Sequence, residues 1–272
     1  MKTKASGIAV LLGLAMSLAS LSVQASTAWT WTLNGTPTTG TATATGYADT
    51  GTGYANNGTT ETTSGKLQAM TTSASDADTP GTMNWWSGYG YGICAPNGGD
   101  QMSGSTCSTT GPHAMDNNLA HESILLSFGS AVSLTAVTIG YSSTDSDISV
   151  LAYTGSGTPS MTTNTYASLL SSGSWTVIGN YANLGVNSPQ AISTSTSSSY
   201  WLVAAYNSVF SSAGCSVSGG CNDGNDYVKL LSVAGTTGGT TQRVPEPSGL
   251  LLFGTALIGA LGLRRRGKAI AA

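Results

Sequence analysis

Apolar and polar residues alternate most regularly in the middle of the chain. Residues 124–128 and 148–152 carry Ile, Leu, Phe, Val or Ala at every second position, which places these side chains on one face of a strand. In the last run of this kind, the predicted buried face carries Tyr227, Leu231 and Val233. Turn-forming residues separate the runs, and no segment has the period of an amphipathic helix. We therefore predict an all-β fold, an antiparallel β-sandwich of the jelly-roll kind. Further alternating runs occupy residues 137–141, 175–177 and 200–206.

The first part of this region, residues 26–110, is rich in Thr, Gly and Ala. A disordered stalk is one explanation of that composition. Its four tryptophans are costly to expose to water, so we predict irregular β-structure packed on the main core instead. Residues 26–234 then form one domain, because no linker interrupts them.

The N-terminus has the layout of a secretory signal. Lys2 and Lys4 precede an apolar run rich in Leu and Ala, residues 8–21. Residues 23–25 then present small side chains where a signal peptidase cuts. This order predicts a signal peptide, residues 1–25, that signal peptidase removes.

Export changes the charge of the protein, because most basic residues lie in the two terminal segments. Residues 26–247 contain three basic residues, Lys66, Lys229 and Arg243, against all twelve acidic ones, a formal charge of −9. Such a surface disfavours nucleic acid as a partner.

The four cysteines are Cys94, Cys107, Cys215 and Cys221. In an exported protein they predict disulfides, and we prefer the two local pairs among the three connectivities that four cysteines allow. A metal site built from these cysteines is the less favoured interpretation, because neither pair has the spacing of a zinc finger.

A proline motif follows the predicted domain. Residues 235–243 are rich in Gly and Thr and predict a flexible linker. Val244, Pro245, Glu246 and Pro247 come next. Two prolines around a glutamate hold the backbone extended, which suits the cleft of a peptidase.

A largely apolar stretch, residues 248–263, ends at Arg264, Arg265 and Arg266. As a helix it is about 24 Å long, short of the ~30 Å hydrocarbon layer. The arginines hold their end in the cytoplasm and can snorkel to reduce the mismatch. The tail 244–272 therefore predicts one transmembrane helix in the inner membrane, with the proline motif on the outer side.

This order of Pro-Glu-Pro, short apolar span and arginine cluster resembles the PEP-CTERM sorting signal. Exported proteins of Gram-negative bacteria that make exopolysaccharide and biofilm carry that signal. The resemblance covers Val244 to about Lys268. It implies that an exosortase, a membrane enzyme of the transpeptidase type, cuts the chain near residues 245–247 after brief retention in the inner membrane. The nucleophile belongs to that enzyme.

The body also resembles the exosortase-dependent surface protein families. The likeness rests on Asp116-Asn117 ahead of residues 122–128, and on residues 146–153 and 200–206. It implies a surface location and a sandwich architecture, and no particular chemistry.

Four residues could be drawn as a metal or acid–base site: His113, Asp116, His121 and Glu122. The His121-Glu122 pair lacks the second histidine of a zincin motif, and the segment does not read as a helix. We therefore interpret the four as ordinary polar groups of a surface loop, and assign no catalytic or metal site.

Two acidic segments resemble pieces of calcium loops. Asp145 and Asp147 form one, and Asp223, Asn225 and Asp226 form the other. Neither completes an EF-hand, and tight turns explain both without metal. No cofactor is assigned, with Ca²⁺ kept as the alternative.

Trp85 and Trp86, followed by Tyr89 and Tyr91, could form a stacking platform for sugar rings. The preferred interpretation is that they cover the open end of the core.

No nucleophile elbow or phosphate loop is found in the sequence, so we do not expect an enzyme. The expected function is that of a structural or adhesive module at the cell envelope or in the extracellular matrix, linked to exopolysaccharide. One alternative is a carbohydrate-binding module. The other is an exported carbohydrate-active enzyme that uses His113, Asp116 or Glu122.

Overall fold

A computed structural model describes residues 27–33, 42–57, 61–73, 79–107, 113–216 and 220–237. The chain divides into two compact units, and all described residues belong to the unit Ser26–Gly238. The predicted signal peptide, proline motif and transmembrane tail lie outside the described residues. Within the described part, no helix is long and apolar enough to cross a membrane.

The described part is mostly β-strand, which confirms the all-β class. Ten strands lie in the first part of the chain, where irregular β-structure was predicted. The strands are β1 (Thr27–Thr32), β2 (Ala42–Ala48), β3 (Ala55–Asn56), β4 (Glu61–Thr63), β5 (Gln68–Ala69), β6 (Thr71–Ser73), β7 (Thr82–Trp86), β8 (Gly90–Cys94), β9 (Met102–Ser103), β10 (Thr106–Cys107), β11 (Met115–Asp116), β12 (Glu122–Thr144), β13 (Ile148–Tyr153), β14 (Trp175–Tyr181), β15 (Gln190–Ala191), β16 (Ser198–Ala205) and β17 (Asp226–Thr237).

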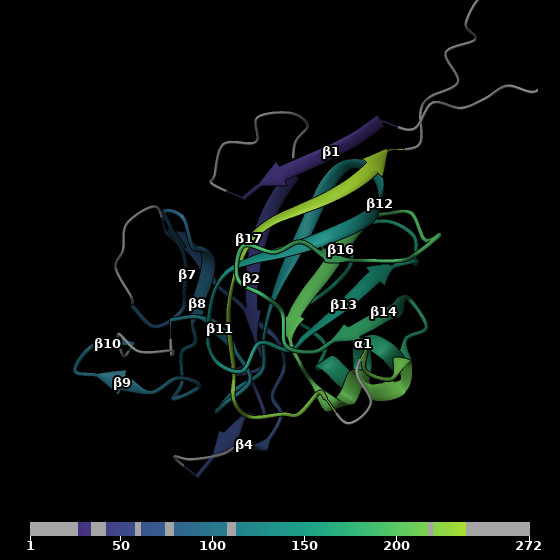
Figure 1. Ribbon diagram of the computed structural model, residues 1–272. Helices are drawn as coiled ribbons and strands as arrows, with labels where there is room; N and C mark the ends of the chain where they lie inside the picture. Colours follow the sequence, from purple (N-terminus) through teal and green to yellow (C-terminus); the bar gives the residue numbers. More distant parts are fainter. Residues whose placement is uncertain are drawn as a thin grey trace, which may run out of the picture. The chain divides into compact units, whose positions relative to one another are not determined.

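One large sheet has the order β14-β13-β16-β12-β17-β8-β7-β6 (Figure 1). Its pairs are antiparallel except β6 and β7, which run parallel, so the prediction of a purely antiparallel sheet is wrong there. The two hairpins β3–β4 and β9–β10 stand apart from this sheet.

Strand β12 connects the two halves of the sheet. Its residues 122–128 pair with β2 and β16, and its residues 132–144 pair with β17. The alternating runs at 124–128 and 137–141, which the sequence presents as separate strands, are therefore parts of one strand. Register shifts near residues 127–132 let this strand change partners.

The main core collects buried side chains from both halves of β12. Ile124 and Leu126 come from the first half, Val137 and Ile139 from the second. Trp201 of β16 is fully buried among them, and its Nε1 donates hydrogen bonds to the carbonyl oxygens of Val132 at 3.1 Å and Ser198 at 3.0 Å. Other members are Trp31, Met83, Phe128, Val150, Val203, Val228, Leu230 and Val233.

A second buried cluster uses the opposite faces of the same strands. Leu151 of β13 and Leu202 of β16 pack with Tyr166 and Leu169 of a short helix, α1 (Tyr166–Ser171). Thr165 and Ser168 cap this helix reciprocally. The expectation of no amphipathic helix is wrong here, because six residues are too few to show a helical period. A 3₁₀ turn, η1 (Ser208–Ala213), contributes Phe210.

Strand β17 differs from the prediction in two respects: where the strand ends and which of its side chains are buried. The predicted linker begins at Gly235, yet β17 continues to Thr237 and pairs with β1. The three residues 235–237 therefore belong to the sheet, and residues 238–243 lie outside the described part. On its face, a register shift beside Leu231 buries Val228 and Leu230 instead of the predicted Tyr227 and Leu231.

Candidate functional site

The nine carboxylates of the described residues gather at one end of the strands. Asp49 directly follows β2, Glu122 begins β12, and Asp226 begins β17. Antiparallel pairing brings these ends together, since Ala48 pairs with Glu122 and Thr144 with Asp226. The acidic end, as we call it, comprises Asp49, Glu61, Asp100, Asp116, Glu122, Asp145, Asp147, Asp223 and Asp226.

The first group at the acidic end joins Asp145, Asp147 and Asp226, which the sequence had presented as two separate calcium-like pieces. One carboxylate oxygen of each lies within 4.8 Å of the others. The backbone N–H of Asp147 donates to Asp226 Oδ1 at 2.6 Å, and Asn117 Nδ2 donates to Asp226 Oδ2 at 2.7 Å. Burial, together with the charges of the two neighbours, raises the pKa of Asp226 to about 8. These oxygens are ligands of the type that Ca²⁺ prefers, and Ca²⁺ there stays the untested alternative to no cofactor.

The second group contains Asp100, Asp116 and Glu122. All three side chains are buried, so the interpretation of Asp116 and Glu122 as surface-loop groups is wrong. The segment between them turns back, and Glu122 Oε2 accepts the backbone N–H of Asp116 at 2.9 Å. Burial raises the pKa of Asp116 to about 7, and it raises those of Asp100 and Glu122 well above their ordinary values. Because the charged form is the one that burial disfavours, the folded protein releases these protons at a higher pH than exposed carboxyls do.

The third group surrounds His121 with Asp49, Glu61 and Asp223. Its Nδ1 lies 2.8 Å from Glu61 Oε2 and 3.5 Å from Asp49 Oδ2, and its Nε2 lies 3.7 Å from Asp223 Oδ1. Burial lowers the pKa of His121, but the interactions of the ring with the carboxylates of Asp223, Asp49 and Glu61 outweigh it and raise that pKa well above its usual value. Sequence reasoning missed Asp49, Glu61 and Asp100, because each lies alone in a Thr/Gly-rich segment far along the chain from His121.

The structure separates the four residues that the sequence grouped. His113 does not join His121. Its ring packs on Trp86 with 5.0 Å between ring centres. The supposed metal or acid–base set therefore divides between the acidic end and an aromatic segment.

Trp85 and Trp86 do not form one platform. As neighbours in β7 they point to opposite faces of the sheet. Trp85 contacts Tyr91 edge to face and packs against the main core. Lys229 Nζ lies 4.1 Å from the centre of the Trp86 ring, so a cation already contacts that ring.

Both predicted disulfides are present with the local pairing. Cys94 is bonded to Cys107, and Cys215 is bonded to Cys221. The first bond ties the β9–β10 hairpin to β8. Asp100 lies against it, with Oδ2 3.4 Å from Cys107 Sγ.

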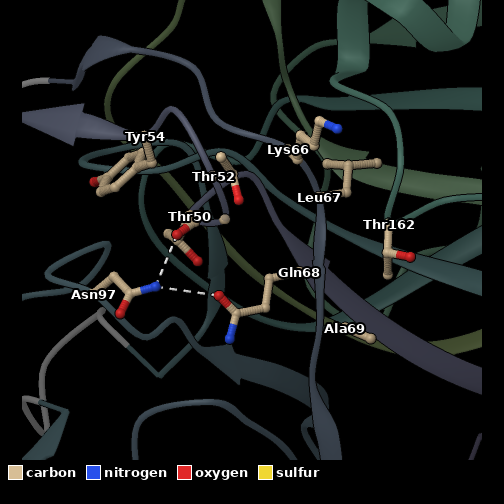
Figure 2. A pocket seen from close by; sticks show the side chains of 10 residues that line it. Thr50, Thr52, Tyr54, Lys66, Leu67, Gln68, Ala69, Asn97 and Thr162 are labelled. Atoms are coloured by element: carbon tan, nitrogen blue, oxygen red, sulfur yellow. Dashed lines mark hydrogen bonds between the residues drawn. The ribbon is translucent and has the colours of Figure 1, made fainter.

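A pocket that the sequence did not predict lies beside Asp49. Its volume is about 580 Å³, and neutral hydroxyl and amide side chains dominate its wall. Figure 2 shows Asn97 bridging the wall, with its Nδ2 donating to the carbonyl oxygen of Thr50 at 2.8 Å and to Gln68 Oε1 at 3.2 Å. Further lining residues are Gly51, Thr52, Tyr54, Lys66, Leu67, Ala69 and Thr162.

Similarity to known proteins is found at the C-terminal end of the chain. No match was found among curated proteins or among solved structures. Residues 243–266 match the PEP-CTERM protein-sorting motif. This match confirms the resemblance found at residues 244–268 and implies export, a place at the bacterial cell envelope or surface, and an exosortase as processing partner. The chain therefore carries a PEP-CTERM protein-sorting motif at residues 243–266.

Proposed function

We propose that this protein is a structural or adhesive module of the cell surface or extracellular matrix, associated with exopolysaccharide in a Gram-negative bacterium. Signal peptidase removes residues 1–25, the tail 244–272 holds the protein briefly in the inner membrane, and an exosortase cuts near Pro245-Glu246-Pro247. The sorting-motif match at residues 243–266 is the observation that carries this proposal.

The arrangement of the acidic groups supports a non-enzymatic role. General acid–base catalysis requires a side chain within hydrogen-bond reach of the substrate. Asp116 and Glu122, the carboxylates considered for such a role, are 1% and 0% exposed. Their burial supports a role in the fold instead of in catalysis.

The fold, one large sheet whose strand β12 pairs with β2 and β16 in its first part and with β17 in its second, supports a passive module. Its two halves share the main core, and the disulfides fix two loops, which suits a protein that works outside the cell. The described part carries only two lysines and no arginine, so an anionic polymer would find few cationic partners.

Cell fractionation tests the sorting part of the proposal. The double variant Pro245→Ala, Pro247→Ala loses the braced peptide, so we expect it to remain in the inner membrane while the wild type reaches the surface fraction. Pro189→Ala changes an exposed proline of the body and serves as the matched control. Normal surface delivery of the double variant would contradict a role for the motif.

A second candidate function is carbohydrate binding, and the pocket in Figure 2 favours it. Its volume suits a small ligand, and its hydroxyl and amide groups match the hydroxyls of a neutral sugar.

An array of neutral oligosaccharides tests this candidate. The double variant Gln68→Ala, Thr162→Ala changes the pocket wall, and we expect it to weaken binding at least tenfold. Gln190→Ala, outside the pocket, should leave the affinity unchanged. Retained binding in the double variant, with loss in Trp86→Ala, would move the sugar site to the aromatic segment instead.

A further inference from the structure

The group around His121 combines three elements that are far apart in sequence. Asp49 follows β2, Glu61 begins β4, and His121 immediately precedes β12. Glu61 Oε2 and Asp49 Oδ2 both face the same ring atom, Nδ1 of His121, at 2.8 Å and 3.5 Å. The three atoms all lie within 4.8 Å of one another.

These distances fit a shared metal ion. Tetrahedral zinc with bonds of about 2.0–2.2 Å to nitrogen and oxygen places its ligand atoms about 3.3 Å apart. The two distances to Nδ1 lie on either side of that value. One imidazole with two carboxylates is a ligand set that suits zinc, whereas calcium and magnesium take oxygen ligands alone.

The surroundings of the three ligands also match a metal centre. A metal-bound histidine generally directs its other ring nitrogen at a carboxylate, which orients the ring. His121 Nε2 is inaccessible to solvent and makes no hydrogen bond within the described residues, and Asp223 Oδ1 faces it from 3.7 Å. Asp49 is held on both oxygens, since Oδ1 accepts the N–H of His121 at 2.9 Å and Oδ2 accepts Ser64 Oγ at 2.8 Å.

Charge favours a divalent cation at this place. Three carboxylates surround one imidazole, and His121 is the ion-pair partner that all three share among the described residues. A protonated ring leaves an excess of two negative charges. A divalent ion on a neutral ring would reduce that excess to one, and Asp49 is fully buried, where uncompensated charge is costly.

We propose that Asp49, Glu61 and His121 bind a zinc-class divalent transition-metal ion, with Asp223 as the carboxylate that orients the histidine. The ion ties the β3–β4 hairpin to the ends of β2 and β12. This proposal depends neither on carbohydrate binding in the pocket of Figure 2 nor on cleavage at the sorting motif.

Zinc titration of the full chain, monitored with a chromophoric chelator as competitor, tests the site. We expect one Zn²⁺ per chain, with millimolar Ca²⁺ or Mg²⁺ unable to displace it. Glu61→Gln and His121→Asn should each weaken zinc binding at least tenfold, and Asp223→Asn about tenfold. His113→Asn, which changes the chain's other histidine, should bind zinc like the wild type.

Circular dichroism and intact disulfides, checked by mass, show that each variant is folded. Glu61 lies in a short hairpin and is partly exposed, so Glu61→Gln keeps the test open if His121→Asn fails to fold. Absence of zinc binding by the folded wild type would overturn the proposal and leave an imidazolium held by three carboxylates. Equal zinc affinity of the wild type and folded Glu61→Gln, or displacement of the zinc by calcium, would also overturn it.

Discussion

The apolar core and the acidic end are built on the same strands and depend on different physics. In the core, β12 and β16 contribute hydrocarbon side chains that shed water at every second position. At the acidic end, the same strands terminate among carboxylates with few cations to balance them. The core is therefore expected to be stable over a wide pH range, whereas the acidic end makes folding stability depend on pH and on cations.

The largest expected effect is in the core. Trp201→Ala removes a fully buried indole and its two hydrogen bonds, so we expect a loss of about 3–5 kcal/mol in the free energy of unfolding. Denaturant unfolding measures it. Val186→Ala, at a position that is 43% exposed, should cost less than about 0.5 kcal/mol. Similar small losses for both variants would remove the distinction between core and surface.

The next effect belongs to the acidic end and depends on pH. The pKa of Asp116 is raised to about 7, and that of Asp226 to about 8, mainly by burial, so the folded state keeps protons that the unfolded chain releases. The stability from these protons is present below the ordinary carboxyl pKa of about 4 and is lost as the pH rises through about 7 and 8. The melting temperature should therefore fall from pH 5 to pH 9.

Asp116→Asn tests this pH dependence. The amide removes a buried acid and can still accept the N–H of Asn118, so we expect it to flatten the fall and to stabilise the protein at pH 9. The gain should be on the order of a few kcal/mol, because a tenfold change in an acid constant corresponds to about 1.4 kcal/mol. Asn118→Ala, on the same turn, should keep the wild-type slope. An unchanged slope in Asp116→Asn would exclude Asp116 as its source.

The smallest expected effect concerns the border between sheet and tether. A Cβ added at Gly235 would lie 2.6 Å from Val132 Cγ1 and 3.2 Å from the Trp31 ring. Gly235→Ala should therefore cost about 1–3 kcal/mol in denaturant unfolding, whereas Gly239→Ala, in the predicted linker, should be neutral. If Gly235→Ala leaves the free energy of unfolding unchanged, residue 235 belongs to the linker and not to the sheet.

The sequence predicted what depends on local patterns. The two-residue alternation located parts of β12, β13, β14, β16 and β17 and several of their core residues, and export with local cysteine spacing predicted both disulfides. Gly235 was assigned to the linker from the Gly/Thr-rich composition around it. Composition does not reveal that the Trp31 ring and the neighbouring strand β12 leave no room for a side chain at this position. The six residues of α1 were too few to show a helical period.

The acidic end could be predicted only in fragments. Asp145 and Asp147 were singled out, and so was Asp226, but 79 residues separate Asp147 from Asp226, so only the folded register shows that they meet. Asp49 and Glu61 reach His121 from 72 and 60 residues away. Which of these distant residues come into contact depends on how the strands pair, and no local sequence motif reveals that pairing.

The intact mass of the surface-delivered protein tests the central claim most directly. It should be measured in a host with an exosortase and in the same host without one. Cleavage near Pro245-Glu246-Pro247 predicts that Leu250 to Ala272 are missing from the mass in the first host and present in the second. Retention of these residues in both hosts would make the tail a permanent anchor and contradict processing.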